Sequence, residues 1–449
     1  MKLFGTDGIR GKAGTAPLDR PTVSRVGAAI VRAMNDTPEG VSPQAPLRFV
    51  IGRDTRESGT WIEEELARGI ASEGGTAVSV GVVPTPAVAY LARTEGFDAG
   101  IVISASHNPY EDNGIKVFGG TGTKLTEALE ASVERLVADA SWPSPPGEPR
   151  LERADLSAPY LEHLEQILDT AGPLADSLIV VDCANGATFE LAPALFRRLG
   201  FAVEAIGVTP DGRNINLACG STHLDGLARE VVASGARLGV AFDGDGDRAL
   251  FVDHAGRIVD GDAIMLMAAI YLKDRGRLPG NTVVATVMSN VGLEIAMRDR
   301  GITVLRTAVG DKYVMEEMVK GGFALGGEQS GHVIFSEHLF TGDGMATALN
   351  VLRIMADTGR ELAELAAALV TYPQVLVNVR VREKKDYMTV PAIADTMRKV
   401  EGNLAGNGRL LVRYSGTEPL LRIMLEGKDQ DQIRHWADEI AAAVRTSLS

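Results

Sequence analysis

Short apolar runs alternate with amphipathic helical patterns along most of this chain, and that alternation restricts the folds open to it. Strand-like apolar runs occur at residues 47–52, 77–82 and 99–103, with helical spacing of apolar residues between them. Strands connected by helices pair in parallel and need helices on both faces of the sheet. The same order of elements returns over residues 177–253 and 282–326. We therefore expect an α/β protein with three similar mixed α/β domains and largely parallel sheets.

The end of the chain has a different pattern. Residues 374–381 alternate between apolar and polar side chains, and shorter strand-like runs follow at 409–414 and 420–426. Helical patterns lie between and after these runs. This arrangement predicts a small C-terminal α+β domain with an antiparallel sheet.

The chain is long enough for several domains. Its 449 residues exceed what one hydrophobic core usually holds. The segment Ser141–Pro149 contains four prolines in nine residues and is the clearest boundary signal. We expect four domains around a central cleft, with limits at residues 1–150, 151–257, 258–370 and 371–449.

Charge and composition limit the classes of partner. A net charge of −14 argues against a nucleic-acid binder, although local arginines can still hold an anionic substrate. Cys183 and Cys219 form no C-x-x-C pair, which predicts reduced thiols. The N-terminal residues lack the apolar core of a signal peptide, and the apolar run Ala263–Leu272 is too short to span a bilayer. We expect a soluble, cytoplasmic protein that binds neither nucleic acid nor membrane.

The first candidate site follows the apolar run at 99–103. Ser104, Ser106 and His107 come directly after this strand-like run, and open α/β sheets place their chemistry beyond the carboxyl ends of strands. We predict that Ser106 carries a phosphoryl group. A polar surface loop is the alternative that spacing alone leaves open.

The second candidate site is the acidic sequence D-G-D-G-D-R. Asp243, Asp245 and Asp247 alternate with glycines, and such hard oxygen ligands suit Mg²⁺. An EF-hand loop is excluded because Arg248 and His254 stand where it needs glycine and glutamate. A dinucleotide-binding loop is excluded because a strand follows where a helix is required. We predict a magnesium site, and an acidic turn without a metal is the weaker alternative.

Two further glycine-containing motifs offer polar side chains. In Gly326–His332, Glu328 and Ser330 are placed to bind sugar hydroxyls, and His332 can move a proton. The segment Arg413–Pro419, with Arg422 beyond it, can bind a phosphate through hydroxyls, backbone amides and arginines. Each motif alone is equally compatible with an ordinary turn. The sequence Gly120–Lys124 resembles a phosphate loop but lacks its G-K-[ST] ending.

Together, the four motifs resemble those of the α-D-phosphohexomutase family in order and spacing. The similarity extends from Phe4–Gly11 to the last helix, and Val181–Gly186, Asn214–Asn216 and Gly310–Val314 resemble bacterial members that act on amino sugars. The resemblance implies interconversion of glucosamine 6-phosphate and glucosamine 1-phosphate through a phosphoserine and a sugar 1,6-bisphosphate, in the synthesis of UDP-N-acetylglucosamine for the cell wall. A mutase of glucose or mannose phosphates is the alternative, and a Mg²⁺-dependent sugar phosphatase is the alternative from another class.

The resemblance also implies roles for individual residues. Ser106 is implied to be the phosphoserine and, with Asp243, Asp245 and Asp247, to hold Mg²⁺. Lys116, His332 and Arg10 are the candidates for proton transfer and charge stabilisation. The remaining residues are implied to bind the substrate, a hexosamine phosphate: Arg248, Glu328, Ser330, Arg413, Ser415, Gly416, Thr417 and Arg422. The resemblance leaves a homodimer open, and we expect the C-terminal domain to close as a lid.

Overall fold

The chain folds into two compact units. The computed structural model describes residues 2–5, 7–36, 46–139, 145, 147–168, 170–415 and 419–448. One unit contains Met1–Met288 and Leu305–Ala366, and the other contains Ser289–Val304 and Ala367–Ser449. The proline-rich segment 141–149 lies for the most part outside the described residues. Among the described helices, none has both the length and the apolar character that crossing a bilayer requires.

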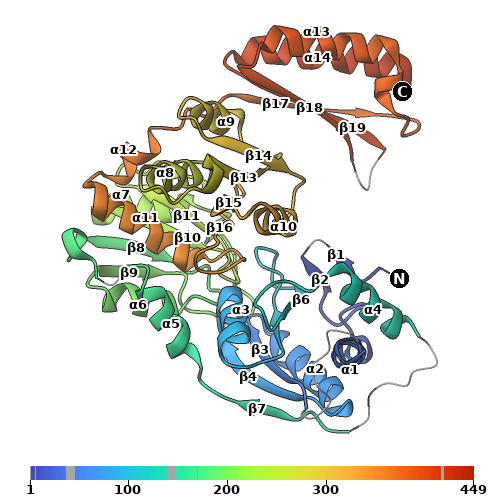
Figure 1. Ribbon diagram of the computed structural model, residues 1–449, viewed down its shortest axis with the longest axis vertical. Helices are drawn as coiled ribbons and strands as arrows, with labels where there is room; N and C mark the ends of the chain where they lie inside the picture. The colour runs from blue at the N-terminus through green and yellow to red at the C-terminus, as the bar shows by residue number, and fades with distance from the viewer. Residues whose placement is uncertain are drawn as a thin grey trace. The chain divides into compact units, whose positions relative to one another are not determined.

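The first sheet of the larger unit has seven strands in the order β1-β2-β6-β5-β3-β4-β7 (Figure 1). Strands β3, β4, β5 and β7 pair in parallel, whereas β1, β2 and β6 pair antiparallel at the other edge. The strands are β1 (Phe4–Gly5), β2 (Gly8–Lys12), β3 (Arg48–Arg53), β4 (Thr76–Val82), β5 (Ala99–Ile103), β6 (Asp112–Gly119) and β7 (Leu151–Arg153). The helices are α1 (Arg20–Asn35), α2 (Gly59–Ser72), α3 (Thr85–Thr94) and α4 (Glu127–Ala138).

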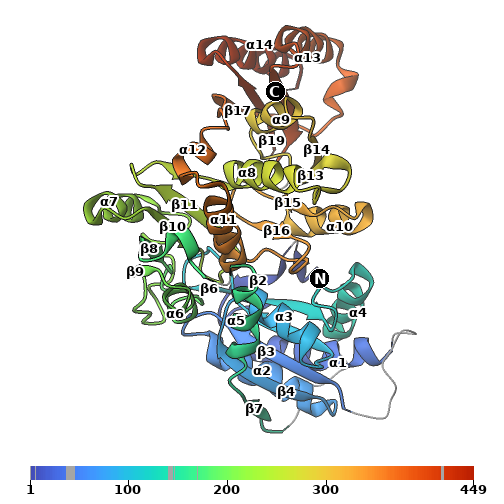
Figure 2. The same cartoon turned by 60° about the vertical axis from the view of Figure 1, so that its left-hand side comes forward.

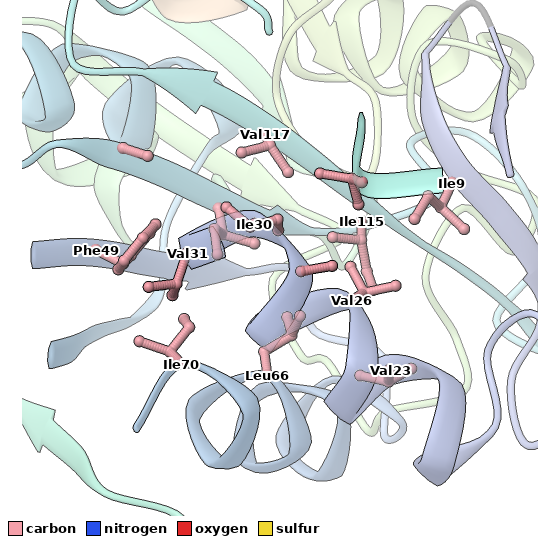
Figure 3. Close-up of a cluster of buried hydrophobic side chains, with 14 of the residues drawn as sticks. Ile9, Val23, Val26, Ile30, Val31, Phe49, Leu66, Ile70, Ile115 and Val117 are labelled. Atoms are coloured by element: carbon pink, nitrogen blue, oxygen red, sulfur yellow. The ribbon is translucent and has the colours of Figure 1, made fainter. Parts of the chain in front are cut away.

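Helices cover both faces of this sheet. On one face, Ile30 of α1 and Leu66 of α2 pack with Phe49 and Ile115 of the strands (Figure 3). Each such side chain is fully buried, and its burial contributes roughly 1.5–3 kcal/mol. On the other face, α3 approaches closely, because a Cβ on Gly52 of β3 would lie 2.5 Å from Val88 of α3. The absence of a side chain at Gly52 therefore allows α3 to lie close to the sheet.

The second sheet has the order β12-β11-β10-β8-β9, with β8 parallel to β9 and β10, and β11 and β12 antiparallel. Its elements are α5 (Ser157–Glu165), the 3-10 helix η1 (Gly172–Leu174), β8 (Leu178–Asp182), α6 (Leu191–Arg198), β9 (Ala202–Ile206), α7 (Asp225–Ser234), β10 (Leu238–Phe242), β11 (Ala249–Asp253) and β12 (Ile258–Val259). Helix α5 packs against α3 (Figure 2). The ring of His163 on α5 stacks on that of Tyr90 on α3 with centroids 4.5 Å apart.

The third sheet has the order β14-β13-β15-β16. Strands β13 and β15 are parallel, and β15 and β16 are antiparallel. The elements of this part of the chain are α8 (Gly261–Asp274), η2 (Pro279–Asn281), β13 (Thr282–Thr286), α9 (Val291–Arg298), β14 (Thr303–Thr307), α10 (Asp311–Gly321), β15 (Leu325–Gly327), β16 (Val333–Phe335), α11 (Gly344–Thr358) and α12 (Leu362–Ala366). Of these, α9 belongs to the smaller unit.

The smaller unit contains a three-stranded antiparallel sheet with the order β17-β19-β18. Its elements after α9 are β17 (Gln374–Arg380), η3 (Tyr387–Thr389), α13 (Pro391–Leu404), β18 (Gly408–Tyr414), β19 (Leu420–Gly427) and α14 (Gln430–Leu448). The fold class predicted from the sequence is confirmed. The division into four domains at residues 150, 257 and 370 stays a prediction.

Candidate active site

Ser106 lies in the loop that follows β5. Its backbone has φ 52°, in the left-handed region that residues other than glycine seldom adopt. Its carbonyl accepts hydrogen bonds from Arg56 Nη2 and Asn216 Nδ2, each at 2.9 Å, and its amide donates to Ser104 Oγ at 2.9 Å. A conformation of this kind costs on the order of 1–3 kcal/mol and persists only when its surroundings hold it. These three hydrogen bonds hold the loop in that conformation.

A buried ion pair supports the Ser106 loop. Arg56 and Asp54 follow β3, are both fully buried, and bring Arg56 Nε within 2.9 Å of Asp54 Oδ2. Asp54 also accepts a hydrogen bond from Ser104 Oγ. Burial raises the pKa of Asp54, and the Arg56 guanidinium opposes that shift. The hydroxyl of Ser104 is therefore engaged in holding the loop, whereas that of Ser106 faces the acidic loop.

Three carboxylates meet in the acidic loop after β10. Asp243, Asp245 and Asp247 are buried, and each offers a carboxylate oxygen within 4.8 Å of the others. Asp243 Oδ2 accepts the hydroxyl of Ser106, and Asp245 Oδ2 accepts Thr85 Oγ1 at 2.6 Å. Burial, together with the charges of Asp247 and Asp245, raises the pKa of Asp243 well above its ordinary value. The repulsion among these groups would be relieved by a cation.

Two oxygens of the acidic loop are available to a cation. Asp245 Oδ1 and Asp247 Oδ1 are buried and accept no hydrogen bond. Arg248 Nε lies 3.7 Å from Asp247 Oδ1, which is beyond hydrogen-bonding distance. Buried acceptors without a donor are rare in folded proteins. Three carboxylates beside a hydroxyl fit a hard divalent cation such as Mg²⁺.

Glycine allows the acidic loop and the Ser106 loop to meet. A Cβ on Gly244 would lie 2.5 Å from the carbonyl oxygen of Ser106 and 2.8 Å from Asn216 Nδ2. Any larger residue at position 244 would separate the two loops. The glycines of D-G-D-G-D-R therefore serve the contact between two sheets as well as the turn itself.

Lys116 and His332 flank the acidic loop. Lys116 Nζ lies 2.8 Å from Asp245 Oδ2 and 3.4 Å from Asp247 Oδ2, and His332 Nδ1 lies 3.5 Å from Asp247 Oδ2. Burial opposes the charge of Lys116, but Asp245 and Asp7 outweigh it and raise the pKa well above its ordinary value. Burial also opposes the charge of His332, and Asp247 outweighs it and raises that pKa. The structure thus brings Lys116 and His332, two of the three predicted candidates for proton transfer and charge stabilisation, to the predicted metal ligands.

A cavity of about 380 Å³ lies beside these groups. Five of the predicted site residues line it: Arg10, Asp247, Arg248, Glu328 and His332. The Nε atoms of Arg10 and Arg248 are buried and donate no hydrogen bond. Buried cationic donors without an acceptor suit an anion such as a phosphate. The cavity therefore offers an anionic ligand a place despite the net charge of −14.

The predicted sugar-binding loop is held against the start of α8. Glu328 and Ser330 line a further cavity of about 500 Å³ together with Arg248. Glu328 Oε1 accepts the amide of Gly310 at 3.1 Å, and Glu328 Oε2 lies 3.4 Å from Ser330 Oγ. A Cβ on Gly261 would lie 2.1 Å from the carbonyl oxygen of Glu328. The backbone of the loop thus packs directly on the first residue of α8.

The predicted phosphate-binding residues of the smaller unit lie on β18, on β19 and between them. Arg413 and Arg422 are directly opposite each other in the antiparallel ladder, so their side chains share a face. Arg422 Nη2 lies 3.5 Å from Ser415 Oγ, and Lys384 Nζ donates to the carbonyl of Ser415 at 2.7 Å. Like charges placed opposite each other are unfavourable without an anion. The predicted Gly416 and Thr417 lie outside the described residues.

His107 remains beside Ser106 as a neutral group. Its Nδ1 lies 3.4 Å from Ser106 Oγ, and its side chain lines the 380 Å³ cavity. Burial and the charges of Arg248 and Arg10 lower the pKa of His107 to about 4.

The structure adds residues to the site that sequence reasoning passed over. Thr85 followed by Pro86 predicts a helix cap, yet Pro84 occupies the cap position of α3 and Thr85 donates to Asp245. The other additions are polar side chains that contact residues of the predicted sites, namely Asp7, Asp54, Arg56 and Asn216. Lys124 contacts Asp7 in turn. A sequence signal existed for Asp54 and Arg56, because they follow a predicted strand just as Ser106 does.

Models of the phosphoglucomutase/phosphomannomutase family match the chain in four consecutive parts. Alpha/beta/alpha domain I matches residues 1–143, domain II residues 158–256, domain III residues 260–372, and the C-terminal domain residues 376–443. Together the four matches cover most of the chain.

Curated relatives are similar over nearly the whole length. The chain is 51% identical to the phosphoglucosamine mutase of Solibacter usitatus, covering 99% of each chain. It is 49% identical to the phosphoglucosamine mutase of Moorella thermoacetica, covering 97% of each.

Solved structures share the fold at lower identity. A phosphoglucomutase/phosphomannomutase family protein from Burkholderia thailandensis is 24% identical with a TM-score of 0.79, covering 99% of this chain and 98% of that one. The N-acetylphosphoglucosamine mutase of Aspergillus fumigatus, solved with GlcNAc-6P and magnesium, is 20% identical with a TM-score of 0.68, covering 100% of this chain and 96% of that one. The resemblance drawn from four motifs is confirmed, and the chain belongs to the phosphoglucomutase/phosphomannomutase family.

Proposed function

We propose that the chain is a phosphoglucosamine mutase that interconverts glucosamine 6-phosphate and glucosamine 1-phosphate. The observation that carries the proposal is the hydrogen bond from the Ser106 hydroxyl to Asp243, within a cluster of three buried carboxylates. A serine in this place can carry a phosphoryl group whose charge a bound cation offsets. The amino sugar is supported by the phosphoglucosamine mutases that are 51% and 49% identical to the chain.

In this proposal, Ser106 is the phosphoserine that donates to the sugar and later accepts from it. Transfer to glucosamine 6-phosphate forms glucosamine 1,6-bisphosphate, and return of the other phosphoryl group leaves glucosamine 1-phosphate. Each transfer breaks one P–O bond and forms another, so the phosphate count of enzyme plus sugar is unchanged. The serine must therefore meet both ends of the sugar in turn.

Mg²⁺ is the proposed cofactor, held by Asp243, Asp245 and Asp247 together with the oxygen on Ser106. When bound, it withdraws charge from the phosphoryl oxygens during transfer. Oxygens of Asp245 and Asp247 that accept no hydrogen bond support this assignment. Phosphorylation of Ser106 would supply a further oxygen ligand.

The proposed roles of the other residues follow from their placement. Lys116 is charged beside the metal ligands and neutralises developing charge, and His332 exchanges a proton with the sugar hydroxyl. Arg10 and Arg248 offer free donors to a phosphate in the 380 Å³ cavity. The set proposed to bind the substrate further comprises Glu328, Ser330, Arg413, Ser415, Gly416, Thr417 and Arg422.

The proposed function also implies a cellular location and a set of binding partners. It acts in the cytoplasm on a small hexosamine phosphate and binds neither nucleic acid nor membrane. The acidic net charge of −14 supports the lack of nucleic-acid binding. A homodimer is compatible with these roles.

The deciding experiment combines mass spectrometry with mutase assays. Purified protein incubated with glucosamine 1,6-bisphosphate should carry one phosphate, mapped to the peptide that contains Ser106. Ser106→Ala should abolish both the phosphate and the activity, a loss of about 10⁴-fold or more. Ser132→Ala on α4 is the matched control and should keep both.

Assays with glucosamine, glucose and mannose 6-phosphates test the substrate. The highest kcat/KM is expected with glucosamine 6-phosphate. A phosphate on Ser104, or full activity of Ser106→Ala, would overturn the role of Ser106. A preference for glucose or mannose would retain the role of Ser106 and overturn the amino sugar.

A further inference from the structure

Six acidic and basic side chains alternate in a closed ring that includes predicted site residues. Each carboxylate lies between two cationic or basic groups, and the last contact returns to the first residue. In order, the ring consists of Lys116, Asp7, Lys124, Asp311, His332 and Asp247. Three members, Asp7, Lys124 and Asp311, have no role in the proposed reaction.

Lys124 is the member that links two parts of the ring. Lys124 is the last residue of the sequence Gly120–Lys124, which resembles a phosphate loop. Its ammonium group contacts carboxylates of the same chain. Its Nζ donates to Asp7 Oδ1 at 2.6 Å and to Asp311 Oδ2 at 2.5 Å. Its side chain is 13% exposed. Asp7 comes from the first sheet and Asp311 begins α10, so one ammonium group connects elements that are far apart in sequence.

Asp7 transmits this contact to the predicted catalytic lysine. Its Oδ1 is taken by Lys124, while its Oδ2 lies 3.0 Å from Lys116 Nζ and 2.5 Å from Arg10 Nη2. Because one oxygen is fixed by Lys124, the other is aimed at Lys116 and Arg10. Lys116 is then held between Asp7 on one side and Asp245 on the other.

Asp311 anchors the other side of Lys124. Its Oδ2 accepts Lys124 Nζ and lies 3.8 Å from His332 Nε2, which accepts the amide of Gly342 at 3.1 Å. Its Oδ1 accepts the backbone amide of Lys312 at 2.8 Å, which ties the carboxylate to the first turn of α10. The histidine therefore faces Asp311 on one ring nitrogen and Asp247 on the other.

Lys124 itself does not reach the substrate. Among the described residues, Asp7, Asp311 and His332 line the 380 Å³ cavity, and Lys124 does not. Its contacts are with groups that in turn contact the site. Any effect of Lys124 on the reaction must therefore pass through Asp7 and Asp311.

We propose that Lys124 is a positioning residue for phosphoryl transfer, which is anchored on Asp311 and holds Asp7, and through Asp7 orients Lys116. The inference rests on the proposed mutase function. Catalytic groups displaced by about 1 Å can lose on the order of 100-fold in rate, so loss of Lys124 should lower kcat while leaving substrate binding nearly intact.

The test compares Lys124→Met with Lys124→Arg. For Lys124→Met we expect kcat to fall about tenfold to hundredfold, with KM for glucosamine 6-phosphate within about threefold of the parent. Lys124→Arg keeps the charge and two-sided hydrogen bonding and should recover most of the loss. Lys320→Met is the matched control, since Lys320 is 78% exposed on α10, and its kinetics should be unchanged.

Two further measurements separate positioning from general stability. Thermal unfolding of Lys124→Met should shift to a lower midpoint, because Asp7 and Asp311 lose a largely buried counter-charge, and kinetics are measured below that midpoint. Lys124→Gln replaces Lys124→Met if that variant does not fold. In a single turnover, the rate at which phosphorylated Ser106 transfers its phosphoryl group to glucosamine 6-phosphate should fall by the same factor as kcat.

The outcomes distinguish the two proposals. A kcat of Lys124→Met within twofold of the parent, a KM that rises as much as kcat falls, or no recovery by Lys124→Arg would each overturn the role of Lys124. If the parent prefers glucose or mannose 6-phosphate, the amino-sugar assignment fails and Lys124 is tested with that sugar. A parent that converts no hexose phosphate overturns both.

Discussion

Several polar residues of this site are almost completely shielded from solvent. Ser106 is only 1% exposed, and its hydroxyl faces Asp243 because three neighbours fix its backbone. Arg56 and Asp54 are fully buried as a pair, which offsets part of the cost that either charge would have alone. The reactive hydroxyl therefore depends on residues that never touch a substrate.

Asp343 is a buried carboxyl with a measurable effect on pH-dependent stability. It caps α11, with Oδ1 accepting the amide of Ala346 at 2.9 Å and Oδ2 accepting the hydroxyl of Tyr160 at 3.0 Å. Burial raises its pKa to about 6. The native state therefore holds a proton here between about pH 4 and pH 6, where the unfolded carboxyl has lost it, so stability falls as the pH rises through that window.

Asp343→Asn keeps the capping oxygen but cannot lose a proton. We expect this variant to lack the fall in stability that accompanies the rise in pH. Relative to the parent, its free energy of unfolding should rise by about 3 kcal/mol between about pH 4 and pH 7. Denaturant unfolding of both proteins at the two pH values measures the difference. A difference that does not change with pH would contradict the raised pKa.

At the scale of elements, the site is made by the carboxyl ends of strands in two sheets. Strands β3 and β5 of the first sheet end in the loops of Arg56 and Ser106, and β10 of the second sheet ends in the acidic loop. Glycine at 244 allows the loops to touch. Parallel strands align their carboxyl ends at one edge, which is why loops distant in sequence meet there.

Gly261 tests whether α8 positions the sugar-binding loop. A Cβ at this first helical residue would lie 2.1 Å from the carbonyl oxygen of Glu328. Gly261→Ala should therefore displace the loop and lower kcat/KM for the hexose phosphate about tenfold or more. Helix propensity alone would instead predict that Gly261→Ala raises the free energy of unfolding by up to about 1 kcal/mol.

Gly226→Ala is the matched control for Gly261→Ala. Gly226 is the second residue of α7, and a Cβ there would meet nothing within 4 Å. Its activity should be unchanged and its melting temperature equal or higher. If Gly261→Ala behaved in the same way, α8 would have no part in placing the loop.

At the scale of the whole molecule, the chain leaves the larger unit and returns to it. Ser289–Val304, with α9, groups with Ala367–Ser449. Within the smaller unit, Asn290 exchanges hydrogen bonds with the backbone of Tyr372 at 2.9 and 3.0 Å. Glu426 is fully buried and accepts Val291 N and Asn290 Nδ2, each at 3.2 Å, and Arg409 Nη2 lies 2.8 Å from it.

Glu426→Gln should destabilise the smaller unit. The amide replaces one acceptor oxygen with a donor, so one of the buried donors around it loses its acceptor and Arg409 loses its counter-charge. We expect a loss of roughly 2–4 kcal/mol, seen by calorimetry as a transition that moves to lower temperature.

Glu439→Gln is the control for this prediction. Glu439 lies on α14, and its partner Lys399 is 61% exposed, so the pair contributes little. Its unfolding should match that of the parent. Equal unfolding of Glu426→Gln and the parent would mean that α9 is attached by other contacts.

Much of this protein follows from its sequence alone. Short apolar runs predicted the strands at 99–103, 238–242 and 249–253. Each of these strands is fully buried, so its residues are apolar on both faces. Four local motifs indicated the family, and both the fold class and the family are confirmed. The domain limits and the roles of individual site residues stay predictions.

Only the tertiary structure decided how distant residues share the site. Thr85 has the local pattern of a helix cap, yet its hydroxyl donates to Asp245, 160 residues away. Lys124 has the local pattern of a failed phosphate loop, yet it binds Asp7 and Asp311. A sequence pattern reports on neighbours within a few residues, whereas these contacts arise from the packing of whole sheets. The sequence therefore determined the elements and the chemistry of the motifs, and packing decided which polar groups support them.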